Sequence, residues 1–225
     1  MNRYHSAASK AALARRALLL LAVLALISAG TVMGYFSVLD LVAINRATPD
    51  DATQAFGTVR AANTLLLIVI PVVWVAILRW LRASLQNAHA LDLPHPVVPY
   101  GKINRTVALC ALPGPLIGQP GRLLAMHTES LAGSFGGTGA SRRRADSGSA
   151  RWAARISMVV APLWVGGLIT SHSDHHAVIW VAAGWVSLSA VAILLRQAIA
   201  AVQLGEELHS ALRAAEQRDR SRATR

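Results

Sequence analysis

The sequence predicts an all-α integral membrane protein that has four transmembrane helices, one short re-entrant or interfacial helical segment and a cytoplasmic helical C-terminal extension. Two observations predict this class. Of the 225 residues, 54% are hydrophobic but only 5% are aromatic, so the apolar content is mainly Ala, Leu, Val and Ile. These residues form long blocks bounded by arginine, whereas a soluble domain of this length would spread them at helix or strand period.

The basic residues indicate how the chain lies in a membrane. The formal charge is +11, but the cations flank apolar blocks and do not alternate with stacking aromatics, so we expect no nucleic-acid partner. Only two of the 22 basic residues are lysine, Lys10 and Lys102, which together with the many alanines suggests a GC-rich bacterial genome. We therefore expect the bacterial cytoplasmic membrane as the location.

The first apolar run follows a basic tail at residues 1–16 and covers residues 17–39. At about 1.5 Å per residue, its 23 residues exceed the ~30 Å hydrocarbon core. A cleavable signal peptide is the competing interpretation, because Ser28, Ala29 and Gly30 are small. The run stays apolar well past any such cut, so we favour a signal anchor that spans the membrane.

The second run covers residues 61–78, between a predicted outer loop at residues 40–60 and a cytoplasmic loop at residues 79–105. It contains Pro71, which a transmembrane helix tolerates by kinking. We expect this run to span as well.

The third run is too short and too broken for an ordinary span. Its 14 residues, 106–119, are interrupted by proline and glycine. We predict that residues 106–132 form a segment that dips into the membrane and returns to the same face. A helix lying flat in the interface is the alternative, but residues 107–112 are apolar all round. The predicted re-entrant turn comprises Pro113, Gly114, Pro115 and Pro120.

The rest of the chain predicts two more spans. Residues 133–151 are rich in Gly, Ser and Arg and predict a disordered cytoplasmic loop. Spans follow at residues 152–170 and 177–195, joined by an outer loop at residues 171–176. Residues 196–225 predict a cytoplasmic helix and tail, in which Leu204, Leu208 and Leu212 recur every four residues and form one apolar edge.

The positive-inside rule favours the re-entrant model for the third run. A full crossing would place the arginine-rich loop around residues 133–151 outside, whereas a re-entrant segment keeps it in the cytoplasm. In the re-entrant model only Arg46 and Arg60 of the 22 basic residues lie outside, and both termini are cytoplasmic.

Two small groups of residues are candidate sites. The predicted outer loop at residues 171–176 contains imidazoles and a carboxylate, which are ligand types for zinc or copper. We favour a solvated polar turn, because a six-residue loop seldom supplies four converging ligands, and we expect no metal or other cofactor. Gly30 and Gly34 form a Gly-x-x-x-Gly pair that lets helices approach closely, within the bundle or between two copies. The metal candidates are His172, Asp174, His175 and His176.

The sequence gives little support to an enzyme. It contains no Walker loop, dinucleotide fingerprint, His-Glu-x-x-His or Gly-x-Ser-x-Gly motif. The lone Cys110 has apolar neighbours, so we expect its thiol to be unreactive. No ionisable residue falls within the apolar runs 17–39, 61–78, 156–170 and 177–195, which speaks against pumps and proton-coupled carriers.

The leading interpretation is a non-enzymatic interaction or accessory protein of the membrane. Its expected partners are membrane lipids and either a second copy or another membrane protein. The alternative is a small channel or carrier that uses the re-entrant segment as its path.

Residues 80–130 resemble the central region of the actinobacterial DUF4328 membrane proteins. The likeness lies in Trp80-Leu81-Arg82, in Asn87-Ala88-His89-Ala90-Leu91 and in the spacing of Pro113 and Pro120. Residues 107–112 depart from the family's aromatic run. The resemblance implies about four spans, and because the family's function is undefined it assigns no site residues.

The arginine distribution predicts the topology. Reporters fused at Ser141 and after Arg225 should read cytoplasmic, while a reporter at Ser173 should read extracytoplasmic, because alternation follows from the spans. Paired periplasmic and cytoplasmic reporter assays would check this. An extracytoplasmic signal at Ser141 would contradict the topology.

Overall fold

A computed structural model describes residues 7–91, 93, 96–110, 119–134, 148–170 and 175–223. Within these ranges the chain is helical and contains no strand, so the all-α prediction is confirmed. The elements, in order, are α1 (Ala8–Ala43), α2 (Pro49–Ala90), the short η1 (Tyr100–Lys102), α3 (Ile103–Cys110), α4 (Gln119–Ser134), α6 (Gly148–Thr170) and α7 (His175–Ala223).

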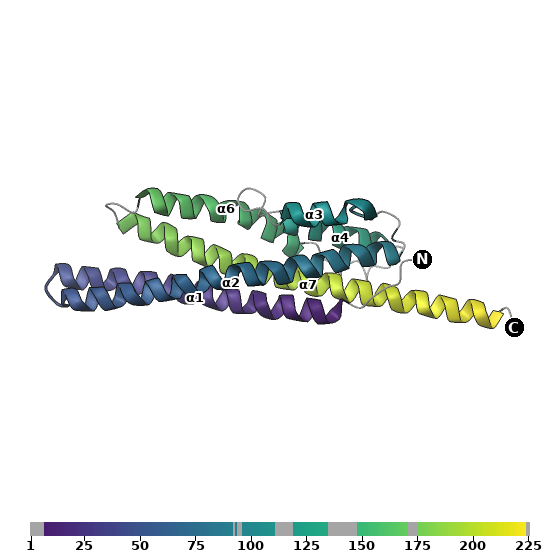
Figure 1. Ribbon diagram of the computed structural model, residues 1–225, viewed down its shortest axis with the longest axis horizontal. Coiled ribbons are helices and arrows are strands. Elements are labelled where there is room, and N and C mark those ends of the chain that lie inside the picture. The colour runs from purple at the N-terminus through teal and green to yellow at the C-terminus, as the bar shows by residue number, and fades with distance from the viewer. Residues whose placement is uncertain are drawn as a thin grey trace.

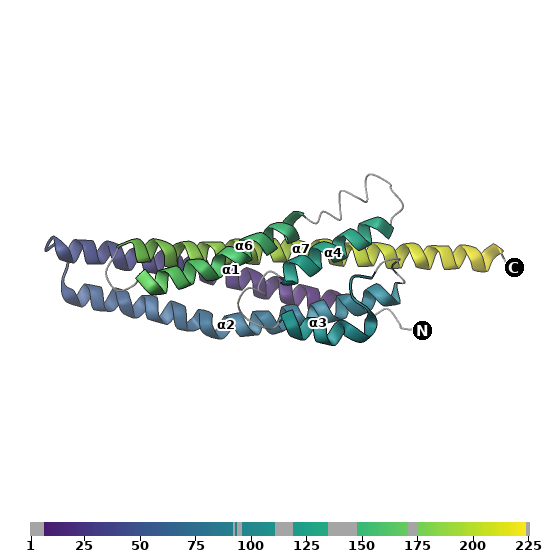
Figure 2. The same cartoon turned by 90° about the horizontal axis from the view of Figure 1, so that it is seen from above.

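Four long helices form an antiparallel bundle. α1 packs along α2 and α7, and α6 packs along α7. The start of α1 and the end of α2 lie at one end of the bundle, and the α1–α2 connection and the start of α7 lie at the other (Figure 1). α3 packs on α2, and α4 packs on α6 and α7. Both views show α7 projecting beyond the other helices towards the C-terminus (Figures 1 and 2).

The α1–α2 connection is shorter than predicted. Asn45 takes the left-handed conformation with φ 56°, and the backbone of Thr48 donates to the Asp51 Oδ2 at 2.8 Å while the Thr48 hydroxyl oxygen accepts from the Asp51 amide. This capping box and Pro49 start α2. The backbone and side-chain hydrogen bonds of Thr48 lower the pKa of Asp51. Most of the predicted outer loop, residues 40–60, is therefore helical.

Other predicted boundaries also move outward from the apolar runs. The basic tail becomes helical at Ala8, α2 continues through Pro71 to Ala90, and α6 begins at Gly148 inside the predicted disordered loop. The apolar pattern marks only the hydrophobic part of a helix. Each helix extends further because its backbone hydrogen bonds do not require apolar side chains. α7 is continuous from His175 to Ala223, so the residues of the last predicted span and of the predicted C-terminal extension form one helix.

Three of the described helices are long and apolar enough to cross a membrane: α1, α2 and residues Ile179–Arg222 of α7. α1 has 36 residues, α2 has 42 and α7 has 49. At about 1.5 Å per residue they measure roughly 54, 63 and 74 Å, well beyond the ~30 Å hydrocarbon core. A helix of this length that crosses a membrane has a substantial part outside the hydrocarbon.

Burial divides the bundle into two parts. In the middle of α2 large apolar side chains face outward, and Leu67 is 69% exposed. Towards the end of α2 most side chains are covered, and Trp80 and Leu81 are at most 1% exposed. We call this covered part the closed end; it comprises residues 80–90 of α2 with Leu91 after it, α3, α4, the first turns of α6 and residues 196–209 of α7.

Close backbone contact fixes α4 at the closed end. A Cβ added at Gly121 would lie 2.9 Å from the Ala150 carbonyl oxygen and 2.9 Å from the Ala154 amide nitrogen, both backbone atoms of α6. Pro120 is buried in the first turn of α4, where proline is tolerated. Pro113, Gly114 and Pro115, the rest of the predicted re-entrant turn, lie outside the described residues.

The contact at Gly121 predicts that adding a single methyl group at this position destabilises the fold. Gly121→Ala should lower the free energy of unfolding by about 1–3 kcal/mol, because the opposing backbone of α6 cannot move aside as a side chain could. Thermal unfolding in detergent, followed by circular dichroism, measures the change. Gly101→Ala is the matched control, since no heavy atom lies within 4 Å of its Cβ position. Equal stability of the two variants would contradict the prediction.

Candidate functional site

The predicted metal residues are not brought together in the described part of the chain. His172 and Asp174 lie outside it, and His175 and His176 are the first residues of α7. Among the described residues, no group of three or more His, Cys, Asp or Glu side chains could hold a metal ion.

The predicted packing glycines face outward. A Cβ at Gly30 or Gly34 would meet nothing within 4 Å, so neither residue provides a close helix contact within the described part of the bundle. No described contact supports the intrachain alternative for these two residues. A role between two copies stays a prediction.

Cys110 ends α3 at the closed end and is buried. Burial raises the pKa of its thiol to about 11. The thiol is therefore protonated near neutral pH, which agrees with an inert cysteine.

The most unusual group of side chains surrounds Glu206, an ionisable residue of α7 with none of its surface exposed. The hydroxyl of Ser84 donates to the Glu206 Oε1, and the Asn87 Nδ2 donates to the Glu206 Oε2 at 2.8 Å. The His127 Nε2 lies 3.4 Å from the Glu206 Oε1. One carboxyl group thus joins α2, α4 and α7, and we call these four residues the Glu206 cluster.

The cluster satisfies the carboxyl group in place of water. An isolated carboxylate moved out of water costs several kcal/mol or more, whereas one that receives hydrogen bonds on both oxygens is tolerated. Two other buried nitrogen atoms of the same helices are not satisfied. The His127 Nδ1 and the Trp80 Nε1 have no hydrogen-bond partner in the part of the chain that the structure describes.

Helical spacing explains how these residues meet. Trp80, Ser84 and Asn87 follow each other at four and three residues and so share one face of α2. On α7, Ile199, Val202 and Glu206 share a face in the same way, and all three are buried. Neighbouring Gly205 admits Leu131 of α4, whose Cδ1 would lie 3.3 Å from a Cβ at that glycine. The absence of a side chain at Gly205 therefore brings α4 close enough for His127 to reach Glu206.

Two further contacts tie the same helices together. His209, one turn beyond Glu206, makes a hydrogen bond with the backbone of Leu91 just after α2, and its pKa is lowered by burial and by nearby Arg213. At the surface, the Arg151 Nε of α6 donates to the Glu129 Oε1 of α4 at 3.1 Å. That exposed ion pair contributes little stability, so the buried cluster is the stronger tie.

The opposite side of α7 is apolar and uncovered. Leu204, Leu208 and Leu212 are 50%, 37% and 48% exposed. The predicted apolar edge is thus a continuous helical edge, but it faces away from the bundle. We call these three residues the leucine edge.

Sequence reasoning missed the Glu206 cluster because the leucine edge was the more apolar side of this helix. The available signal was the strip of apolar and small residues beside Glu206, at three- and four-residue spacing. It comprises Ala198, Ile199, Val202 and Gly205.

Comparison with known protein families, curated proteins and solved structures found no match to this chain. The resemblance to DUF4328 proteins therefore stays a prediction.

The cluster predicts unequal roles for two adjacent glutamates. Glu206→Ala should lower the free energy of unfolding by about 3–5 kcal/mol, because three buried polar side chains lose their acceptor. Glu207→Ala is the matched control and should cost less than about 1 kcal/mol, since Glu207 is exposed and accepts from Gln203 on its own helix. Thermal unfolding in detergent compares the two. A similar loss in both variants would refute the role of Glu206.

Proposed function

We propose that this chain is a non-enzymatic protein of the bacterial cytoplasmic membrane that acts by association through the leucine edge of α7. The observation that carries the proposal is the exposure of three leucines at four-residue spacing on a helix that projects beyond the rest of the bundle (Figure 1). The anchoring part is the bundle itself, with four crossings and the closed end in the cytoplasm.

The course of the chain supports a fourth crossing. α2 ends where α1 begins, whereas α7 begins at the opposite end, and α6 runs between these ends antiparallel to α7 (Figure 1). The 23 residues of α6 would measure roughly 35 Å, enough for a hydrocarbon core of ~30 Å. If α1, α2 and α7 cross the membrane, α2 ends on one side of it and α7 begins on the other. The chain between them must then cross an odd number of times, and α6 supplies one crossing.

The contacts of α4 support a position on the cytoplasmic side of the membrane for this helix. Its neighbours are Ala150 and Ala154 at the start of α6 and Glu206, which lies 11 residues beyond the last predicted span. At about 1.5 Å per residue, that places Glu206 roughly 16 Å past the hydrocarbon edge. The channel alternative depends on the turn at Pro113, Gly114 and Pro115, outside the described residues, and no described contact favours it.

The leucine edge lies where lipid cannot cover all of it. Leu208 and Leu212 follow the last predicted span by 13 and 17 residues, roughly 20 and 25 Å along a helix that leaves the membrane. Apolar side chains in water gain about 25 cal/mol for each Å² that a partner covers. The outward-facing residues of the spans gain nothing comparable, because lipid already surrounds them.

A second copy of the chain is the partner that the membrane favours. Two copies inserted the same way hold their α7 helices parallel and at matching heights, so each leucine meets its own counterpart. Membrane anchoring also raises the effective concentration of one helix near the other. Two leucine edges can therefore associate in the membrane even though an isolated peptide of this length would not form a stable dimer.

The proposal is tested by disulfide trapping in membranes. In a Cys110→Ala background, Leu208→Cys should give an oxidised dimer, because position 208 faces its counterpart. Ala214→Cys is the matched control; it is exposed on a different face of α7 and should stay monomeric. Non-reducing electrophoresis after mild oxidation gives the result. No dimer at position 208, or equal dimer at both positions, would contradict this mode of association.

A further inference from the structure

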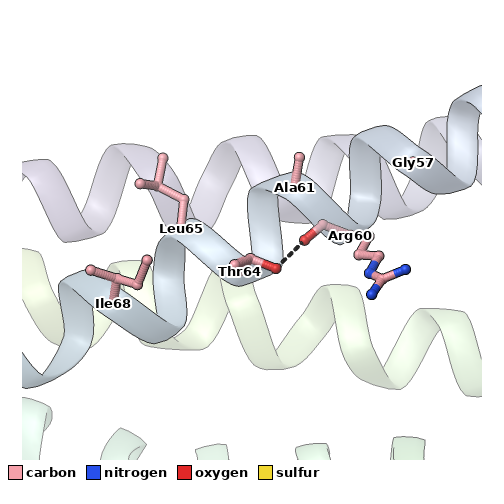
Figure 3. A pocket seen from close by; sticks show the side chains of 6 residues that line it. All are labelled: Gly57, Arg60, Ala61, Thr64, Leu65 and Ile68. Carbon is pink, nitrogen blue, oxygen red and sulfur yellow. Dashed lines mark hydrogen bonds between the residues drawn. The ribbon is translucent and has the colours of Figure 1, made fainter.

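A groove of about 500 Å³ lies on α2, far from the Glu206 cluster and the leucine edge. Figure 3 shows that its lining comes from successive turns of this one helix. The lining residues are Gly57, Arg60, Ala61, Thr64, Leu65 and Ile68.

Small residues at one end of the lining create the groove. A Cβ at Gly57 would meet nothing within 4 Å, and Ala61 adds only a methyl group one turn later. Further along, Leu65 is 46% exposed and Ile68 is 62% exposed, so apolar side chains border the groove. The hydroxyl of Thr64 donates to the Arg60 carbonyl oxygen at 2.8 Å and is thus occupied within the helix (Figure 3).

Arg60 is the one charged residue in this lining. In the described part of the chain, its guanidinium forms no ion pair with a carboxylate. It directly precedes the apolar run 61–78, so it lies at the edge of the hydrocarbon nearest the α1–α2 connection. Leu65 and Ile68 follow by five and eight residues, roughly 8 and 12 Å deeper along the helix.

The polar and apolar parts of the groove match those of a phospholipid. The groove has a cation at headgroup depth and an apolar wall that continues into the hydrocarbon, where an occupant finds no water and no free hydrogen-bonding group. We propose that the groove binds an anionic phospholipid, with the phosphate paired to Arg60 and one acyl chain along Leu65 and Ile68. The groove is shallow and open on one side, so an acyl chain lying in it would keep contact with the surrounding lipid.

Charge complementarity selects an anionic lipid over a zwitterionic one. A zwitterionic headgroup carries its own cation next to the phosphate, so it gains less from the guanidinium. One basic residue near an anionic lipid surface contributes about 1 kcal/mol, which corresponds to roughly fivefold in affinity. The proposal does not depend on the leucine edge, because the two surfaces share no residue.

Native mass spectrometry of the full chain in detergent tests the proposal, with phosphatidylglycerol and phosphatidylcholine as separate probes. The unaltered chain should retain phosphatidylglycerol about fivefold better than phosphatidylcholine. Arg60→Ala should abolish that preference. Arg46→Ala is the matched control, because Arg46 is an exposed arginine in the same α1–α2 region, outside the groove, and should leave the preference unchanged.

A second variant tests the apolar wall. Ala61→Leu fills the groove without changing its charge and should reduce the retention of both lipids. Three outcomes would overturn the proposal: equal retention of the two lipids by the unaltered chain, an equal loss in Arg46→Ala and Arg60→Ala, or a change of oligomeric state in Ala61→Leu with lipid retention intact. The last outcome would show that a second copy occupies the groove. If Ala61→Leu does not fold, the pair of arginine variants still decides.

Discussion

The carboxyl group of Glu206 constrains how α2, α4 and α7 meet at the closed end. Buried away from water, it needs donors on both oxygens, and Ser84 and Asn87 of α2 and His127 of α4 stand at the required positions. Three helices must therefore meet at one height. A shift of α4 or α7 by a single residue would turn these partners away and leave polar groups unpaired, so the cluster sets the register of the helices as well as their contact.

In the proposed membrane arrangement, the two parts of the bundle meet different solvents. In the spans, outward-facing side chains such as Leu67 can remain exposed because lipid is as apolar as they are. At the closed end water replaces lipid, and apolar side chains such as Trp80 and Leu85 are covered by protein. α3 and α4 supply much of this cover. Their short length suits that role, since in the proposed arrangement they need to cover only the part of α2 and α7 that leaves the hydrocarbon.

α7 runs through both parts of the bundle, and one of its faces is buried while the opposite face is exposed. One side holds Glu206 and Val202 inside the closed end, and the other presents the leucine edge to the surroundings. Association through that edge would leave the buried cluster intact, because the two sets of side chains lie on different faces of the same helix. The groove at Arg60 belongs to the far end of the bundle. The proposed binding of lipid there and the proposed contact between copies at the leucine edge would therefore be physically separate events.

The sequence by itself determined the local features of this protein. Long apolar runs predicted α1, the middle of α2 and the apolar part of α7, because lipid-facing helices need only local composition. The recurrence of Leu204, Leu208 and Leu212 every four residues predicted the helical extension after residue 195. Local pattern could not place Gly30 and Gly34, since a Gly-x-x-x-Gly pair is the same inside a bundle and on its surface.

Only the tertiary structure decided which side of α7 is buried and which residues satisfy Glu206. Its partners Ser84, Asn87 and His127 lie 122, 119 and 79 residues away in the sequence. Both sides of α7 have helical spacing, and hydrophobicity alone favours the leucine edge for burial. The structure buries the other side instead, because Gly205 lets α4 approach and the donors of α2 and α4 offset the cost of removing a carboxyl group from water.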